Sequence, residues 1–247
     1  MYPQSYVTLV GETSSGKSTI INGFYKEELL PTRVTPTTGT VTQIINDYGR
    51  KENEYSAINK DGTYEPLKYD IFKMLSLKPD DNLLRLQVQK TQLEKEFDSL
   101  NLFDTPGYNS LTADHELILR TYMPESDVII FTVLYRNGFT LVDQLLMSSI
   151  VELTTNDNIP VFLAINRCPE FASINDKRVK EIVSHAEDTL HRSIKPFLVY
   201  SVVNDENNSP IYPQAIELWL DTANIVTDKE HKYEILKRGK LFIENIL

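Results

Sequence analysis

The sequence has little cysteine, no long apolar run and no excess of positive charge. Cys168 is the only cysteine among 247 residues, so an internal disulfide is impossible and a reducing compartment fits. No run of about 18 apolar residues and no signal-peptide pattern occurs, so no membrane span is predicted. The 25 basic and 35 acidic residues give a net charge of −10, which argues against a nucleic-acid surface. We therefore expect a cytoplasmic domain that binds no nucleic acid.

A short stretch near the start carries the strongest motif. Residues 11–19 read GETSSGKST and fit the phosphate-loop pattern G-x-x-x-x-G-K-[ST]. A β-rich apolar run precedes the motif and a helical pattern follows it, which favours a true phosphate loop over a chance glycine turn. The predicted nucleotide-binding residues here are Gly11, Glu12, Thr13, Ser14, Ser15, Gly16, Lys17, Ser18 and Thr19.

The chemistry of this loop explains how an acidic chain can bind a nucleotide. Main-chain N–H groups at a helix N-terminus wrap the β-phosphate and create a local positive potential. Lys17 is expected to bridge the β- and γ-phosphates, and the Ser18 hydroxyl is expected to ligate Mg²⁺.

Two further segments supply candidate ligands. DTPG, residues 104–107, follows a second buried strand, so Asp104 could hold Mg²⁺ through water and the Gly107 amide could contact the γ-phosphate. An ordinary turn is the alternative, because these residue types favour turns. The segment 30–44 contains six threonines, of which Thr38 is a candidate second Mg²⁺ ligand. Its threonines could equally favour the coming strand.

The segment INRCPE, residues 165–170, ends a strand where GTPases place the base-reading pattern [NT]-K-x-D. Asn166 fits this pattern and Arg167 can replace the lysine, although a plain surface charge is an equal interpretation. Pro169 stands where the guanine-reading aspartate would be, with Glu170 one residue later. The backbone near Ser201 is expected to share base discrimination with Asn166.

The hydrophobic pattern predicts the fold class. Short apolar strands alternate with amphipathic helices after residue 97, which indicates a mostly parallel sheet covered by helices on both faces. We therefore predict an α/β fold of the P-loop NTPase type. The expected division is a GTPase domain over 1–225 and a C-terminal amphipathic helix over 226–247, which could begin a neck or stalk.

Taken together, GETSSGKST, LPTRVTPTTGTVTQI and LNLFDTPGYNS resemble the dynamin superfamily, most of all its bacterial-type members, over about residues 6–202. The family's Leu-Pro…Thr switch spacing runs from Leu30 and Pro31 to Thr38, which selects that threonine. The resemblance implies a GTPase domain on an eight-stranded core, usually joined to a helical stalk that remodels membranes. No stalk of that size fits after residue 202, so we expect an isolated GTPase domain.

The resemblance also implies ligands and partners. It implies GTP or GDP with Mg²⁺, a K⁺ or Na⁺ ion held partly by Ser14, and a nucleotide-dependent homodimer through the nucleotide face. Membrane contact would come only through regions absent from this chain. Two residues depart from related patterns: Tyr108 stands where Ras-like GTPases carry a water-orienting glutamine, and Thr13 stands where eukaryotic dynamins carry glutamine.

The sequence therefore predicts GTP hydrolysis by in-line attack of water on the γ-phosphate. The expected catalytic residues are Ser14, Lys17, Thr38 and Gly107. A pseudo-GTPase that binds nucleotide as an assembly element is the first alternative, favoured by the altered NRCP motif and Thr13. A P-loop ATPase or kinase is the second, but it leaves Thr38 and DTPG unexplained.

Overall fold

A computed structural model describes residues 5–32, 40–47, 51–78, 81–91, 100–108, 113–154, 159–200, 203–204, 210–211 and 215–227. Thr38, Ser201 and residues 228–247 of the helix expected over 226–247 lie outside these residues. None of the helices within them is long and apolar enough to cross a bilayer.

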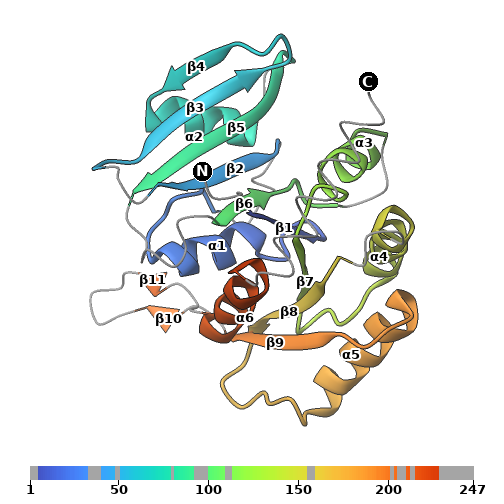
Figure 1. Cartoon of the computed structure of the whole chain (residues 1–247). Coiled ribbons are helices and arrows are strands. Elements are labelled where there is room, and N and C mark those ends of the chain that lie inside the picture. The colour runs from blue at the N-terminus through green and yellow to red at the C-terminus, as the bar shows by residue number, and fades with distance from the viewer. Residues whose placement is uncertain are drawn as a thin grey trace.

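The described residues contain one large sheet in the strand order β4-β3-β5-β2-β6-β1-β7-β8-β9 (Figure 1). Its strands are β1 Ser5–Gly11, β2 Thr42–Asp47, β3 Glu54–Asn59, β4 Tyr64–Leu67, β5 Leu83–Thr91, β6 Leu100–Asp104, β7 Val128–Leu134, β8 Val161–Cys168 and β9 Lys195–Tyr200. A separate hairpin pairs β10 Val203–Asn204 with β11 Pro210–Ile211. The helices are α1 Lys17–Tyr25, α2 Tyr69–Leu77, α3 Ala113–Tyr122, α4 Leu141–Thr154, α5 Lys177–Leu190 and α6 Ile216–Thr227.

The parallel part of the sheet places the strand ends that matter for function along one edge. β6, β1, β7, β8 and β9 all pair in parallel. Leu9 pairs with Asp104, and Gly11 pairs with Thr132, so the carboxyl ends of three central strands lie side by side. Ligands bind at this edge in open α/β sheets. The predicted fold class is confirmed.

The large sheet has nine strands where the resemblance implied eight. Residues 54–67 form two antiparallel strands, β3 and β4, around a turn at Asp61 and Gly62. The Asp61 side chain accepts a hydrogen bond from the Thr63 main-chain nitrogen (2.9 Å), and Gly62 has a φ of 83°. Together with β5 and α2 this hairpin extends the sheet beyond β2, in the upper part of Figure 1.

Two apolar clusters bury the two faces of the sheet. Alternate side chains of β7 divide between them: Val128 and Ile130 join α1, α2 and α6 in one cluster, while Ile129, Phe131 and Val133 join α3, α4 and α5 in the other. This alternation follows from the two-residue period of a strand. The prediction of helices on both faces is thereby confirmed.

The helix α6 was not predicted from the sequence. Trp219 of α6 is buried, and its ring lies 4.5 Å from that of Phe24 in α1, measured between centroids. Lys195 of β9 forms an ion pair with Asp221 of α6. Val226 is buried in the same cluster as Trp219, so α6 continues through the expected division at residue 225.

This packing predicts that α6 stabilises the nucleotide-binding domain. Trp219→Ala should lower the free energy of unfolding by about 3 to 5 kcal/mol, because it leaves a large cavity beside Phe24. Leu220→Ala is the matched control, since Leu220 lies on the same helix and is 50% exposed. Urea unfolding followed by circular dichroism measures both. Equal, small effects of the two substitutions would show that α6 is dispensable to the core.

Candidate functional site

The phosphate loop connects the end of β1 to the start of α1 and requires glycine at two positions. Gly11 has a φ of 153°, and a Cβ atom there would lie 2.3 Å from the Thr132 carbonyl oxygen. Gly16 has a φ of 94°, and its Cβ would lie 2.0 Å from the Asn166 side-chain nitrogen. Neither contact is sterically possible, so any side chain would push the loop away from β7 or β8. Between these glycines Ser14 is exposed and has a φ of 63°.

Lys17 is buried below the loop at the first turn of α1. Its Nζ donates hydrogen bonds to the carbonyl oxygens of Gly11 (3.0 Å) and Glu12 (3.2 Å). Burial lowers the pKa of Lys17 to about 8, although the negative charges of Asp104, Asp143 and Glu12 oppose this shift. The loop therefore holds its lysine through its own carbonyl groups.

Ser18 and Asp104 form a pair of oxygen ligands. The Ser18 hydroxyl donates to Asp104 Oδ2 at 2.6 Å, and both side chains are buried. This set fits Mg²⁺, which takes one or two protein oxygens and completes its octahedron with phosphate oxygens and water. Among the described residues no group of three or more His, Cys, Asp and Glu side chains gathers as a metal site.

The DTPG segment lies directly against the phosphate loop. Thr13 donates its main-chain N–H to the Tyr108 carbonyl (3.1 Å), and the Tyr108 N–H donates to the Gly11 carbonyl (3.3 Å). A Cβ on Gly107 would lie 2.3 Å from Thr13 Cα. Close approach of two backbones thus requires glycine at position 107. Tyr108 itself is buried, and burial raises the pKa of its hydroxyl.

The NRCPE segment contacts the loop through Asn166. Its side-chain nitrogen donates to the Ser15 carbonyl (2.8 Å), and its side-chain oxygen accepts from the Arg167 N–H (2.8 Å). Arg167 is exposed with a φ of 55°, where the pairing of β8 with β9 shifts register. Burial raises the pKa of the Cys168 thiol to about 11, so this cysteine is not a reactive nucleophile. Glu170 is exposed.

The structure thus brings the predicted residues of three segments together. The phosphate loop over 11–19 contacts Asp104 through Ser18, Gly107 through Thr13, and Asn166 through Ser15. Arg167 lies next to this cluster in the chain, with its side chain toward solvent.

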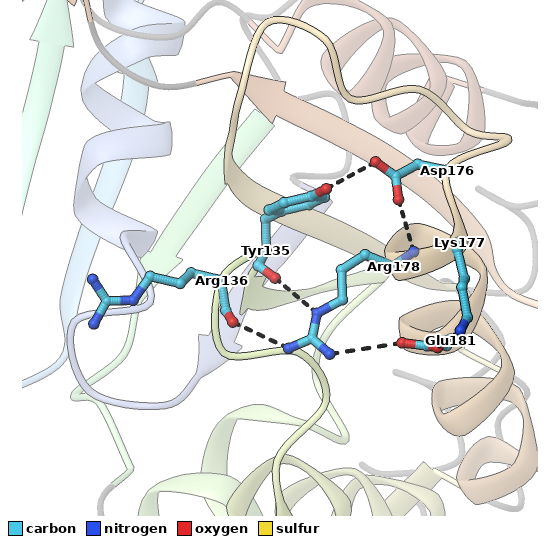
Figure 2. A network of polar contacts seen from close by, with 6 residues as sticks. All are labelled: Tyr135, Arg136, Asp176, Lys177, Arg178 and Glu181. Atoms are coloured by element: carbon cyan, nitrogen blue, oxygen red, sulfur yellow. Dashed lines mark hydrogen bonds and ion pairs between the residues drawn. The ribbon is translucent and has the colours of Figure 1, made fainter.

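Sequence reasoning missed a polar network that ties the loop after β7 to the start of α5 (Figure 2). The Tyr135 hydroxyl donates to Asp176 Oδ2 (2.8 Å), and Asp176 Oδ1 caps α5 by accepting from the Arg178 N–H (2.7 Å). The Arg178 guanidinium donates to the carbonyls of Tyr135 (3.3 Å) and Arg136 (3.1 Å). The Arg136 side chain points away from this network in Figure 2. These bonds fix the β7–α4 loop beside the segment that follows Asn166.

A second missed residue is Asp143, at the start of α4. The Thr140 N–H and hydroxyl both donate to Asp143 Oδ2 (2.9 and 2.8 Å), and the Asp143 N–H donates to the Thr140 hydroxyl (3.1 Å). This reciprocal pair is a capping box, which the sequence signals as Thr-x-x-Asp before an apolar run. Asp143 is 2% exposed. Burial raises its pKa to about 6, and the two hydrogen bonds from Thr140 oppose this shift. Smaller effects come from Glu12, which adds to the shift, and from Lys17, which opposes it.

The sequence is similar to known proteins over much of its length. The sequence profile of the Dynamin family matches residues 7–164. An uncharacterized protein in the xynA 3′ region of Caldicellulosiruptor sp. (strain Rt8B.4) is 25% identical over 189 residues, 75% of this chain and 44% of that protein. A probable transmembrane GTPase of Arabidopsis thaliana, FZO-like and chloroplastic, is 25% identical over 133 residues, 51% of this chain and 11% of that protein. The chain thus spans less than half the length of these relatives.

Solved structures show the same fold. A chain of an oligomerised bacterial dynamin pair superposes with a TM-score of 0.69 at 15% identity, over 100% of this chain and 49% of that one. A mutant of Toc33 from Arabidopsis thaliana gives a TM-score of 0.51 at 11% identity, over 92% of this chain and 85% of that one. The fold and the loop define a P-loop GTPase domain. The chain belongs to the dynamin family, as the resemblance in its sequence predicted.

The buried carboxyl group of Asp143 predicts a pH-dependent cost to stability. Its folded-state pKa of about 6 lies above the reference value of 3.8, so the folded protein binds more protons between these pH values. The contribution of Asp143 to stability is therefore full below about pH 4 and lost as the pH rises through about 6.

Asp143→Asn should remove this loss while keeping the hydrogen bonds of the cap. The variant should gain up to about 3 kcal/mol over the wild type near neutral pH and little near pH 4, because each pKa unit is worth about 1.4 kcal/mol. Urea unfolding of both proteins between these two pH values measures the difference. A difference that does not change with pH would show that Asp143 has an ordinary pKa.

Proposed function

We propose that this chain binds GTP and hydrolyses it to GDP and phosphate. The observation that carries the proposal is the preformed phosphate loop, in which Lys17 Nζ is held by the carbonyls of Gly11 and Glu12 while Ser18 meets Asp104. Family membership supports the same function.

The reaction is in-line attack of water on the γ-phosphate, and the chain contributes position and charge. Lys17 neutralises the β- and γ-phosphates, and the main-chain N–H groups of the loop surround the β-phosphate. The Gly107 N–H donates to the γ-phosphate from the DTPG segment. Ser18, Asp104 and Thr38 would hold Mg²⁺, which would neutralise charge developing on the phosphate oxygens.

Guanine is the preferred base, with weaker selectivity than in a GTPase that carries the reading aspartate. An aspartate at position 169 would accept hydrogen bonds from two guanine donors and would be left unpaired beside adenine. Pro169 has no side-chain acceptor, so it cannot select guanine in this way. The side-chain nitrogen of Asn166 donates a hydrogen bond to the Ser15 carbonyl, and this bond couples the base side of the site to the phosphate loop. The Arg167 stem and the backbone near Ser201 complete the base site.

The longer protein assembles through its nucleotide face and acts on membranes. One solved relative is described as an oligomerised bacterial dynamin pair that senses and tethers membranes over a long range. In this chain, a second domain facing the nucleotide would exclude water and strengthen the charge interactions at the γ-phosphate. A K⁺ or Na⁺ ion near the exposed Ser14 would add positive charge there. The membrane-binding regions lie outside this chain, which operates in the cytoplasm.

Removal of the buried cation tests nucleotide binding. Lys17→Ala should lower the affinity for a non-hydrolysable GTP analogue by more than about a hundredfold, because the amides cover only part of the phosphate charge. Lys180→Ala is the matched control, since it removes an exposed lysine from α5 and should bind normally. Calorimetry on folded proteins decides. Unchanged affinity of Lys17→Ala, or an ATP analogue bound as tightly as the GTP analogue, would contradict the proposal.

Concentration dependence tests self-association. GTP hydrolysis per molecule should rise over about a hundredfold range of protein concentration, and more strongly in K⁺ than in a cation too large for the site. The net charge of −10 opposes contact between two copies, so added salt should strengthen the effect. Phosphate release measures the rate. Activity per molecule that is constant across the range and indifferent to the cation would reject activation by a second copy.

A further inference from the structure

The base-side segment, residues 166–176, runs from the end of β8 to the cap of α5, and both of its ends are bonded to Tyr135. The Tyr135 N–H donates to the Asn166 carbonyl (2.9 Å). The Tyr135 hydroxyl donates to Asp176 Oδ2 (2.8 Å). One residue of the β7–α4 loop therefore joins the two ends of the segment that contains Asn166 and Arg167.

Arg178 fixes the turn that carries Tyr135. Its Nε donates to the Tyr135 carbonyl (3.3 Å), and its Nη2 donates to the Arg136 carbonyl (3.1 Å). The guanidinium lies against Gly138, where a Cβ atom would be 2.7 Å from Nη2. The Arg178 main-chain N–H donates to Asp176 Oδ1 (2.7 Å), so the bonds drawn in Figure 2 link the β7–α4 loop, Asp176 and Arg178 in a closed network. A rigid planar guanidinium can bind two successive carbonyl groups in a fixed geometry, which a lysine ammonium cannot do as well.

The base-side segment requires support of this kind, because regular strand pairing ends within it. β8 pairs with β7 as far as Leu134 and Asn166, and its pairing with β9 shifts register between Asn166 and Cys168. Arg167 lies between them with a φ of 55° and an exposed side chain. Such a conformation persists only where the surrounding structure imposes it. Bonds from outside β8 therefore decide where this segment lies.

Anchoring of α5 does not account for the whole network. The bond from the Arg178 N–H to Asp176 Oδ1 is sufficient as a helix cap. The Tyr135 hydroxyl and the Arg178 guanidinium add bonds that the cap does not use. The ion pair of Arg178 Nη1 with Glu181 Oε2 is long at 3.7 Å, and its side chains are 40% and 46% exposed, so it contributes little.

We infer that Arg178 is a positioning residue for base recognition, because through Tyr135 it holds Asn166 and Arg167 where the guanine base binds. This inference rests on the proposed binding of guanine nucleotides. The bonds of Lys17 to the phosphate loop do not involve Arg178, so its loss should leave the phosphate contacts in place. The cost should therefore fall on recognition of the base, where small displacements of a binding group are expensive.

The affinities for GDP and ADP test this inference, since the phosphates of both nucleotides meet the same loop. Calorimetry of the whole chain should show Arg178→Ala binding GDP about five- to twentyfold more weakly than the wild type, with the ADP affinity changed by less than about twofold. Arg178→Lys should retain part of the lost GDP affinity, because an ammonium can still donate to one carbonyl. Lys177→Ala is the matched control and should bind GDP like the wild type. The Lys177 side chain is 91% exposed and pairs with the same Glu181.

Tyr135→Phe tests the network with a milder change. It removes only the hydroxyl bond to Asp176 and keeps the main-chain bonds and the α5 cap, so it decides the question if Arg178→Ala does not fold. GDP binding should weaken about two- to threefold, and ADP binding should not change.

Equal losses of GDP and ADP affinity in Arg178→Ala, or in Tyr135→Phe, would assign the network a purely structural role and overturn the inference. GDP binding at the wild-type level in either variant, or the same loss in Lys177→Ala, would also overturn it. These results would leave nucleotide binding by the wild type intact. Failure of the wild type to bind GDP would instead refute the proposed function, and the inference with it.

Discussion

The Lys17 ammonium is buried under the phosphate loop and donates to two main-chain carbonyls. The surrounding elements supply what this buried cation requires. A buried cation needs both acceptors and negative charge nearby. The turn at Gly11 aims its carbonyl at the lysine, and the start of α1 at residue 17 brings the side chain back beneath the loop. Asp104 and Asp143 supply negative charge from β6 and α4.

Backbone strain and charge burial concentrate at this edge of the sheet. Of the four non-glycine residues with positive φ among those described, Ser14 lies in the phosphate loop and Arg167 in the base-side segment. Such conformations cost about 1 to 3 kcal/mol each and persist only where the surrounding structure imposes them. The buried Asp143 carboxyl group adds its own cost. The strain at Ser14 and Arg167 and the burial of Asp143 are therefore costs to stability at this edge of the sheet.

Much of the site could be predicted because its residues are local in sequence. Gly16, Lys17 and Ser18 act through one turn, and a strand before and a helix after them are visible in the hydrophobic pattern. Asp104 was recognisable because Asp-Thr-Pro-Gly ends a second buried strand. By contrast, α6 escaped prediction because its role is to cover α1, which lies far away in the sequence, and such packing leaves no local signal. The sheet exceeds eight strands on the side where residues 54–67 form the β3–β4 hairpin.

The sequence by itself determined the class of protein. The steric and hydrogen-bonding requirements of a phosphate loop fix its glycines, lysine and serine at a spacing that can be recognised in the sequence. It also determined the alternation of strands and helices that makes a mostly parallel sheet. Only the tertiary structure decided which distant residues meet that loop. Asn166 reaches Ser15, and Ser18 meets Asp104, because parallel strands place their carboxyl ends at one edge. Those contacts depend on strand order and register, which local sequence patterns do not encode.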